Sequence, residues 1–223
     1  MITLYYGLTP NAFKVTIALE EMGLGYCLEP VNVIQGEQFS EAFGTLNPNN
    51  KIPVLVDDDP PGGGEPMTVF ESGAILLYLA EKTGKFFPQG IRERFEVTQW
   101  LMWQMAGFGP MLGQAHHFLK YSKEKVPYAM GRYGRETKRL YGVLDRHLAG
   151  REFISSDYSI ADMACWPWVY FRNLQDIRLE DYPEVQRWYR NIGQRPAAEK
   201  AMGGLEVQPA PLTDEERKIL FGV

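Results

Sequence analysis

The sequence predicts an α/β domain followed by an all-α domain, and two observations lead to this division. In the first part of the chain, short β-branched and aromatic runs alternate with segments of helical periodicity. From residue 91 onward the strand-like alternation disappears, and long helical segments follow. A Phe-Phe-Pro-Gln-Gly segment between the two patterns is typical of a linker. We therefore expect an α/β domain at residues 1–84, a linker at 85–91, an all-helical domain at 92–204 and a C-terminal tail at 205–223.

The first domain has the predicted order β-α-β-α-β-β-α. We expect four strands, at residues 2–6, 26–33, 53–56 and 67–70, and three helices, at about residues 13–22, 37–43 and 72–83. Gly44 is expected to end the second helix. An acidic, Gly/Pro-rich turn at 57–65 allows a hairpin between the last two strands, whereas the earlier connections carry helices and favour parallel pairing.

The second domain is predicted to be a bundle of long helices. We expect helices at about residues 93–121, 128–148, 160–171 and 185–194. Ser159 and Asp162 have the spacing of a capping box, with Tyr158 and Met163 at the flanking hydrophobic positions. A similar box at Thr213 predicts one short helix in the tail. A Trp/Met cluster at 100–105 is expected in the core or a dimer contact, with one edge lining a substrate site.

Composition excludes several classes of partner. The chain has 23 basic and 28 acidic residues, and this net charge of -5 argues against nucleic acid or an anionic membrane as partner. No apolar run approaches the roughly 20 residues that cross a bilayer, and the start of the chain lacks the pattern of a signal peptide. Cys27 and Cys165 form no CxxC and are expected to be buried, which suits a reducing cytoplasm. His116 and His117 are adjacent on a helix, which is poor geometry for a metal, so we expect no metal.

The first candidate binding feature is the Thr9-Pro10-Asn11 segment at the start of the first helix. Proline suits the first turn of a helix, and the free N–H groups there attract an anion. The Thr9 hydroxyl and the Asn11 amide add two neutral donors. A simple helix cap explains the same residues equally well.

The second feature is a proline that opens a strand after the polar turn Asn49-Asn50-Lys51. Such a proline is a candidate for a cis bond, although only about 5–6% of X–Pro bonds are cis. A cis Ile52–Pro53 bond would turn the Ile52 N–H and C=O outward, where they can pair with a peptide backbone.

The third feature is Glu71-Ser72 at the junction of a strand and a helix. Ser72 and the first N–H groups of the helix can hold a carboxylate, and Glu71 can take an ammonium group. A serine N-cap beside a solvated glutamate remains the alternative.

Together, an anion or thiolate site, a backbone-pairing edge and an amino-acid clamp match the tripeptide γ-Glu-Cys-Gly. The chain resembles the glutathione transferase superfamily over nearly its whole length, in NKIPVL, ESGAILLYLAEK and SIADMACWPW. TPNAFKV, GEQF, NPNN and GPMLGQAHHF are similar to segments of the bacterial Nu class, whose members bind glutathione or its disulfide and reduce disulfide bonds. The tail from residue 205 shows no class pattern.

The resemblance implies a thioredoxin-like first domain, a homodimer and a set of site residues. Thr9 and Asn11 would face the glutathione sulfur as the catalytic pair. The residues implied to bind glutathione are Gln38 at the glycyl carboxylate, Lys51, Ile52 and Pro53 around the cysteinyl unit, Glu71 and Ser72 at the γ-glutamyl end, and Arg132 from the helical domain.

The mechanism that we expect uses no protein thiol, because the chain lacks a CxxC. Bound glutathione would supply the nucleophile, small-molecule disulfides would be the substrates, and a second glutathione would resolve the mixed disulfide. Activation of the thiol by Tyr5 or Tyr6 is an open alternative. Two alternatives for the function also remain: conjugation of glutathione to electrophiles, and a non-catalytic glutathione-binding regulator. Arg132, Arg135 and Arg139 share a helix face that is either solvated or a receptor for ligand carboxylates.

Overall fold

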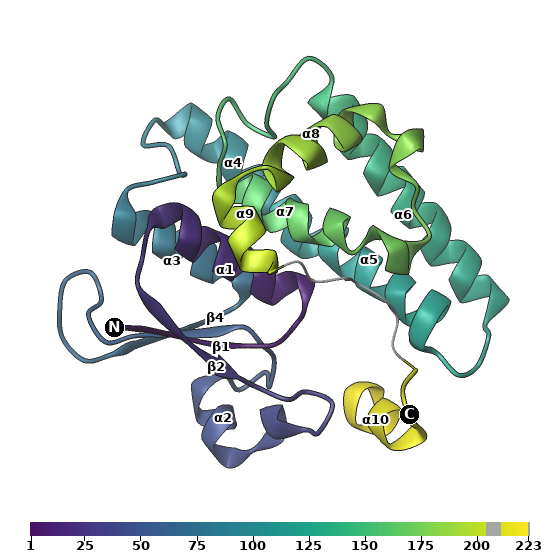
Figure 1. Ribbon diagram of the computed structural model, residues 1–223, viewed down its shortest axis with the longest axis horizontal. Coiled ribbons are helices and arrows are strands. Elements are labelled where there is room, and N and C mark those ends of the chain that lie inside the picture. Colours follow the sequence, from purple (N-terminus) through teal and green to yellow (C-terminus); the bar gives the residue numbers. More distant parts are fainter. Residues whose placement is uncertain (204–210, 223) are drawn as a thin grey trace.

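The computed structural model describes residues 1–203 and 211–222. A four-stranded sheet with helices on both faces is followed by a layer of helices (Figure 1). This is the predicted α/β, then all-α, architecture. The strands are β1 (Ile2–Tyr6), β2 (Tyr26–Pro30), β3 (Val54–Asp57) and β4 (Met67–Phe70). The helices of this part are α1 (Pro10–Met22), α2 (Glu41–Leu46) and α3 (Ser72–Thr83), with a 3₁₀ turn at Glu37–Phe39.

The sheet has the order β2-β1-β3-β4, and one pairing differs from expectation. β1 and β2 are parallel, and β3 and β4 form the expected antiparallel hairpin. β3, however, runs antiparallel to β1, because the chain leaves α2 and places β3 on the other side of β1 from β2. β2 ends at Pro30 instead of residue 33. The helix expected at 37–43 is divided into the 3₁₀ turn and α2, which is capped by Ser40 and continues through Gly44 to Leu46.

The helical part contains more elements than periodicity predicts. Its α-helices are α4 (Ile91–Trp103), α5 (Gly109–His116), α6 (Pro127–Leu148), α7 (Ile160–Tyr170), α8 (Pro183–Gly193), α9 (Pro196–Met202) and α10 (Asp214–Phe221). The expected helix at 93–121 is divided by π-helical turns at Gln104–Phe108 and His117–Tyr121. Because the chain continues in helical form through both turns, periodicity alone does not detect them. Helix α9 is short and starts at a proline, and it was missed.

Helix α1 joins the two parts of the molecule. It packs against α3 beside the sheet and against α7 and α9 of the helical part. Every residue from Ala12 to Leu19 is buried as a result. One continuous hydrophobic cluster extends from the sheet, through α1, into α7 and α8. The start of α1 is therefore held rigidly between two packed layers.

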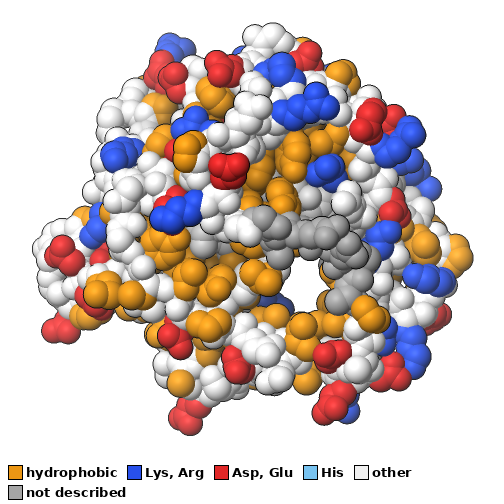
Figure 2. Space-filling model, in the orientation of Figure 1, with side chains coloured by type: hydrophobic (Ala, Val, Ile, Leu, Met, Phe, Trp, Pro, Cys, Tyr) orange, Lys and Arg blue, Asp and Glu red, His pale blue; other side chains and the backbone are white. Residues whose placement is uncertain are grey.

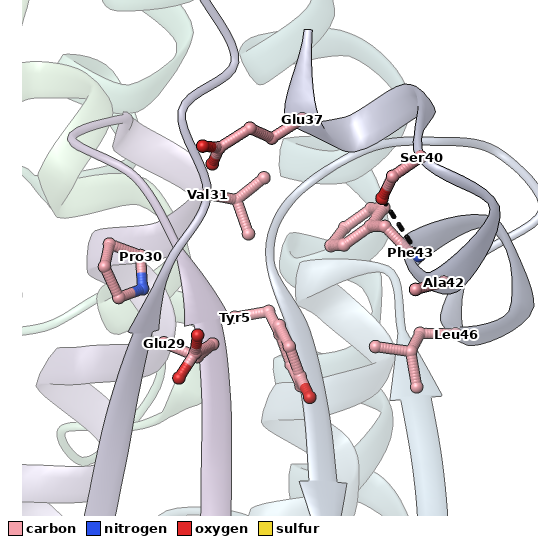
Figure 3. Close-up of a pocket in the computed structure, with 9 residues that line it drawn as sticks. All are labelled: Tyr5, Glu29, Pro30, Val31, Glu37, Ser40, Ala42, Phe43 and Leu46. Atoms are coloured by element: carbon pink, nitrogen blue, oxygen red, sulfur yellow. Dashed lines mark hydrogen bonds between the residues drawn. The ribbon is translucent and has the colours of Figure 1, made fainter. Parts of the chain in front are cut away.

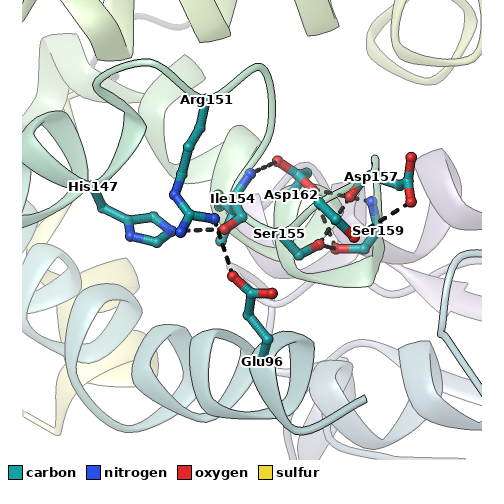
Figure 4. Close-up of polar contacts among 9 residues, drawn as sticks. Glu96, His147, Arg151, Ile154, Ser155, Asp157, Ser159 and Asp162 are labelled. Carbon is teal, nitrogen blue, oxygen red and sulfur yellow. Dashed lines mark hydrogen bonds and ion pairs between the residues drawn. The ribbon is translucent and has the colours of Figure 1, made fainter. Parts of the chain in front are cut away.

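The start of α7 is fixed by the predicted capping box, which the structure confirms. The buried Asp162 carboxylate accepts hydrogen bonds from the Ser159 N–H, the Ile154 N–H and the Trp188 indole N–H at 2.8–3.0 Å. His147 contacts the Ile154 carbonyl at 2.6 Å, so the network also ties the end of α6 to this loop (Figure 4). Four separate segments are thereby connected at one helix end.

The tail and the cysteines complete the comparison with the sequence. Thr213 caps α10 as expected, whereas residues 205–210 and 223 of the predicted tail, and residue 204 of the predicted helical domain, lie outside the described residues. Cys165 is buried, but the expectation that Cys27 is buried is wrong, because β2 is an edge strand and leaves Cys27 exposed. Within the described residues, no helix is both long and apolar enough to cross a membrane.

Candidate active site

A cleft of about 560 Å³ lies between the α/β part and the helical part. Three of the predicted site residues, Asn11, Lys51 and Glu71, line it from separate segments of the α/β part. The other lining residues are Lys14 from α1, Trp168 from α7, Gln104 and Met105 from the π-helical turn after α4, and Gly109, Pro110, Gly113 and Gln114 from α5. The GPMLGQ motif therefore forms one wall of this cleft, and Met105 is the edge of the Trp/Met cluster that reaches it.

Asn11 is oriented by a hydrogen bond across the cleft floor. The indole Nε1 of Trp168 lies 3.1 Å from Asn11 Oδ1. An indole N–H can only donate, so the oxygen of the Asn11 amide must face it. The two N–H groups of Asn11 Nδ2 remain for a ligand in the cleft. The donor role of Asn11 toward the glutathione sulfur stays a prediction.

Thr9 is the N-cap of α1. Its hydroxyl oxygen accepts a hydrogen bond from the Ala12 N–H at 3.3 Å, and Pro10 occupies the first turn. The hydroxyl hydrogen of Thr9 is still available for a second bond. The capping interpretation is therefore confirmed, and it does not exclude contact with a ligand.

Glu71 and Ser72 lie at the start of α3, as expected. The alternative of a serine N-cap is wrong, because the N-cap position is occupied by the preceding residue. Glu71 is the N-cap residue, with a φ of 70°, and Ser72 is the first helical residue. A positive φ is uncommon for a residue with a Cβ and is found preferentially at functional sites. Glu71 is exposed to the cleft, whereas Ser72 is buried beneath it. The free N–H groups of α3 lie beside both side chains.

Ser72 touches a buried lysine that the sequence analysis overlooked. Lys14 is only 1% exposed, and its Nζ lies 3.3 Å from Ser72 Oγ, 2.5 Å from Gln104 Oε1 and 3.3 Å from Met105 Sδ. Burial lowers the pKa of Lys14 to about 7. Within the part of the chain that the structure describes, the hydrogen-bond partners of the Lys14 amino group are all uncharged.

The expected cis bond between Ile52 and Pro53 is present. Asn47 holds the preceding turn, because its Nδ2 donates to the Lys51 carbonyl at 2.7 Å. Strand β3 begins only at Val54, so the Ile52 backbone lies outside the sheet ladder. Lys51 and Ile52 thus form the edge of the α/β part beside the cleft.

Gln38 and Arg132 make their side-chain contacts away from this cleft. Gln38 is buried, and its Nε2 donates to the Val33 carbonyl at 3.3 Å. Arg132 is on α6 with 52% of its side chain exposed, and its nearest ion-pair partner is Glu136 at 3.9 Å. The structure does not bring either residue together with Asn11 and Glu71.

Tyr5 faces a different cavity, of about 470 Å³, between β1, β2 and α2. Figure 3 shows its ring between the two strands and Phe43, on the α2 side of the sheet. Tyr6 instead packs against the main hydrophobic cluster. The two side chains point to opposite faces of the sheet, and neither tyrosine lines the cleft that contains Asn11. This placement disfavours the tyrosine mechanism.

The residues that sequence reasoning missed are Lys14, Gln104, Gln114 and Trp168. Lys14 carries a readable signal, since it is a charge inside the otherwise apolar run from Phe13 to Ala18. Gln104 and Trp168 have no comparable signal, because their contacts with α1 join residues 90 and 157 positions apart.

Charges on the visible face are mixed rather than segregated. Figure 2 shows acidic and basic side chains interspersed over that face, with apolar side chains between them. Among residues 1–203 and 211–222, no group of three or more His, Cys, Asp or Glu side chains is placed to hold a metal ion. The cleft presents hydrogen-bond donors and one buried cation instead.

Comparison with known proteins gives consistent matches. Residues 1–81 match the family model described as glutathione S-transferase, N-terminal domain. The chain is 51% identical to the disulfide-bond oxidoreductase YfcG of Escherichia coli over 91% of this chain and 94% of that protein. It is similar to a glutathione transferase from Pseudomonas putida solved with one glutathione disulfide per subunit (TM-score 0.86, 43% identity, 92% of each chain). It is also similar to one from Burkholderia graminis with two glutathione molecules per subunit (TM-score 0.86, 42% identity, 93% and 89% of the two chains).

Proposed function

Because the chain belongs to the glutathione transferase family, we propose that it is a glutathione-dependent disulfide-bond reductase of the Nu class. The similarity to a named disulfide-bond oxidoreductase supports this reaction. Similar structures that hold glutathione disulfide, or two glutathione molecules, support a cleft with room for two tripeptides.

The observation that carries the proposal is the oriented amide of Asn11. Trp168 fixes its oxygen, so Nδ2 can donate to a sulfur placed at the start of α1. A free thiol has a pKa of about 8.5, and only a few per cent is ionised at neutral pH. Donation from Asn11 and Thr9, together with the helix N-terminus, favours the thiolate over the thiol.

The proposed reaction has two exchange steps. The bound glutathione thiolate attacks one sulfur of the substrate disulfide, which forms a mixed disulfide and releases the other sulfur as a thiolate. A second glutathione thiolate then attacks the glutathione sulfur of the mixed disulfide. Glutathione disulfide forms, and the second substrate thiolate leaves. Two glutathione molecules are oxidised for each disulfide reduced, and no protein thiol changes its oxidation state.

Binding of glutathione is assigned to the α/β wall of the cleft. Glu71 and Ser72 take the γ-glutamyl end, and the Ile52 backbone after Lys51 pairs with the cysteinyl unit. Gln38 and Arg132 would act on carboxylates outside this centre. We also propose a homodimer in the cytoplasm. Exposed Phe95 and Met102 on α4, and Phe70 on edge strand β4, support association through an apolar surface.

One comparison of activities tests the proposed function. Reduction of 2-hydroxyethyl disulfide is measured beside conjugation of chlorodinitrobenzene and a calorimetric glutathione titration. We expect disulfide reduction to dominate. Dominant conjugation would replace the reductase with a transferase, and binding without turnover in both assays would identify a non-catalytic glutathione-binding protein.

A cysteine-free variant tests the role of glutathione as the only thiol. Cys27 is exposed and Cys165 is buried. We expect the Cys27→Ser, Cys165→Ala double variant to keep most of its reductase activity. The contrary result is a folded double variant that loses turnover while one of the single variants retains it. The cysteine that is still present in that active single variant would then be catalytic.

A further inference from the structure

The buried contact between Lys14 and Gln104 fixes the orientation of the Gln104 amide. A lysine ammonium group has three donors and no acceptor. While Lys14 is protonated, the oxygen of the amide therefore faces it, and Gln104 Oε1 lies 2.5 Å from Lys14 Nζ. The amide nitrogen then points in the opposite direction, toward Gly109. A Cβ added to Gly109 would lie only 2.7 Å from Gln104 Nε2.

Gln104 Nε2 is buried and has no hydrogen-bond partner among the described residues. Gln104 itself is fully buried and lines the cleft from a π-helical turn, a feature that is frequent at functional sites. A buried N–H group without a partner costs free energy. A ligand acceptor in the cleft would satisfy it.

The same donor-only argument applies to Ser72. Its oxygen accepts from Lys14, so the Ser72 hydroxyl hydrogen must point elsewhere. The remaining neighbour is Met105 Sδ at 3.6 Å, and a thioether is a weak acceptor. Ser72 thus has a strong donor available at the start of α3.

Among residues 1–203 and 211–222, no carboxylate is in hydrogen-bond contact with Lys14. The charged or titratable groups that face it are Glu71, at the start of α3, and Cys165, on α7. Burial raises the pKa of the Cys165 thiol, which therefore stays protonated and does not neutralise Lys14. Glu71 is exposed to solvent and belongs to the mouth of the cleft. The interior contacts of Lys14 are the uncharged oxygens and sulfur of α3 and the α4–α5 segment.

We propose that Lys14 is a positioning residue of a carboxylate subsite, in which it orients the Ser72 hydroxyl and the Gln104 amide so that both donate to the α-carboxylate of the γ-glutamyl group. The proposal rests on the proposed binding of glutathione in this cleft. The bound carboxylate is the missing counter-ion of Lys14. Binding therefore raises the pKa of Lys14 from about 7, and the protein takes up a proton on binding above neutral pH.

Calorimetry in buffers of different ionisation enthalpy measures this proton uptake. S-methylglutathione is the probe, because its sulfur cannot ionise. For the wild-type protein at pH 8 we expect uptake of about one proton per site, and at pH 6 almost none. Lys14→Met should abolish the uptake. The matched control is Lys138→Met, which removes an exposed lysine of α6 away from the cleft and should leave the uptake unchanged.

A second variant separates positioning from a purely structural role. Gln104→Glu keeps the size of the side chain and gives Lys14 a counter-ion inside the protein. We expect thermal stability to be kept or increased, while affinity for S-methylglutathione falls by roughly ten-fold or more and proton uptake disappears. Two results would overturn the inference and leave the proposed function intact. One is that Gln104→Glu binds S-methylglutathione as tightly as the wild-type protein does. The other is that the wild-type protein binds it without proton uptake. Absence of any binding to the wild type would overturn both.

Discussion

Trp168 and Asn11 are 157 positions apart in the sequence, yet the indole Nε1 of Trp168 donates to Asn11 Oδ1 across 3.1 Å. This bond joins the helical part to the first turn of α1. It turns the oxygen of the Asn11 amide toward Trp168 and leaves the Asn11 Nδ2 group for the cleft. The helical part therefore orients the candidate catalytic amide.

The first prediction concerns this bond. Asn11→Ala should lower kcat for disulfide reduction by roughly 10- to 150-fold, which corresponds to losing about 1.5–3 kcal/mol from a hydrogen bond to a charged sulfur. Trp168→Phe should lower kcat by about five-fold, since the amide loses its fixed orientation at a cost of about 1 kcal/mol. Glutathione affinity should change little in either variant.

Trp166→Phe is the matched control, because its indole also lies on α7 but donates to the Tyr189 carbonyl, away from the cleft. Steady-state kinetics and calorimetric titration give both quantities. Equal losses of kcat in the Trp166 and Trp168 variants would mean that the bond to Asn11 has no part in turnover.

Local patterns predicted some of the site, and contacts between distant segments defined the rest. Asn11 and Glu71 were identified because each lies at a helix start whose signals are contiguous in the sequence. Gln104 and Trp168 were missed because their roles arise only when α1 packs against the helical part. Cys27 was misassigned for a related reason, since sequence alone does not show that β2 is an edge strand.

The second prediction concerns the network at the start of α7. Asp162→Ala should lower the free energy of unfolding by about 3 kcal/mol or more, because it removes a helix cap and leaves the Ile154 N–H and the Trp188 indole unsatisfied. Denaturant unfolding measures the change. Asp157→Ala, an exposed carboxylate in the same loop, should cost less than about 0.5 kcal/mol. Similar losses in the two variants would contradict a specific role for the capping network.

The third prediction is the pH dependence of stability caused by Lys14. Burial lowers its pKa to about 7 in the folded protein, while the unfolded chain keeps the ordinary value near 10.5. Between these two values the unfolded state binds more protons, so the contribution of Lys14 to stability rises with pH. Between pH 7 and 10 the rise is up to about 4 kcal/mol. In Lys14→Met this contribution is absent.

Unfolding of the wild type and of Lys14→Met is therefore compared at pH 6, 7, 8.5 and 10. The stability of the variant minus that of the wild type should fall steadily from pH 7 to pH 10. It should be constant below pH 6, where Lys14 is protonated in both states. A difference that does not vary with pH would show that Lys14 has the same pKa in the folded and unfolded protein.

The last prediction concerns Arg132, which lies outside the cleft that contains Asn11. Disulfide exchange through a mixed disulfide requires two tripeptides near each other, and the second brings carboxylates that Ser72 and the start of α3 cannot also bind. The Arg132 side chain is half exposed, and its ion pair with Glu136 is long, at 3.9 Å. The guanidinium group therefore keeps most of its donors for a ligand. A guanidinium group can hold a carboxylate by two parallel hydrogen bonds, which lysine cannot reproduce.

We therefore expect Arg132→Lys, and more strongly Arg132→Ala, to raise the Kd for glutathione disulfide by roughly ten-fold, while binding of one S-methylglutathione stays within about two-fold of wild type. Arg139→Ala is the matched control, because Arg139 is on the same helix, is 58% exposed and pairs with the same Glu136 at 2.7 Å. Calorimetric titration with both ligands compares the variants. If Arg132→Ala binds glutathione disulfide as tightly as Arg139→Ala does, Arg132 belongs to the solvated face of α6 and not to the second tripeptide site.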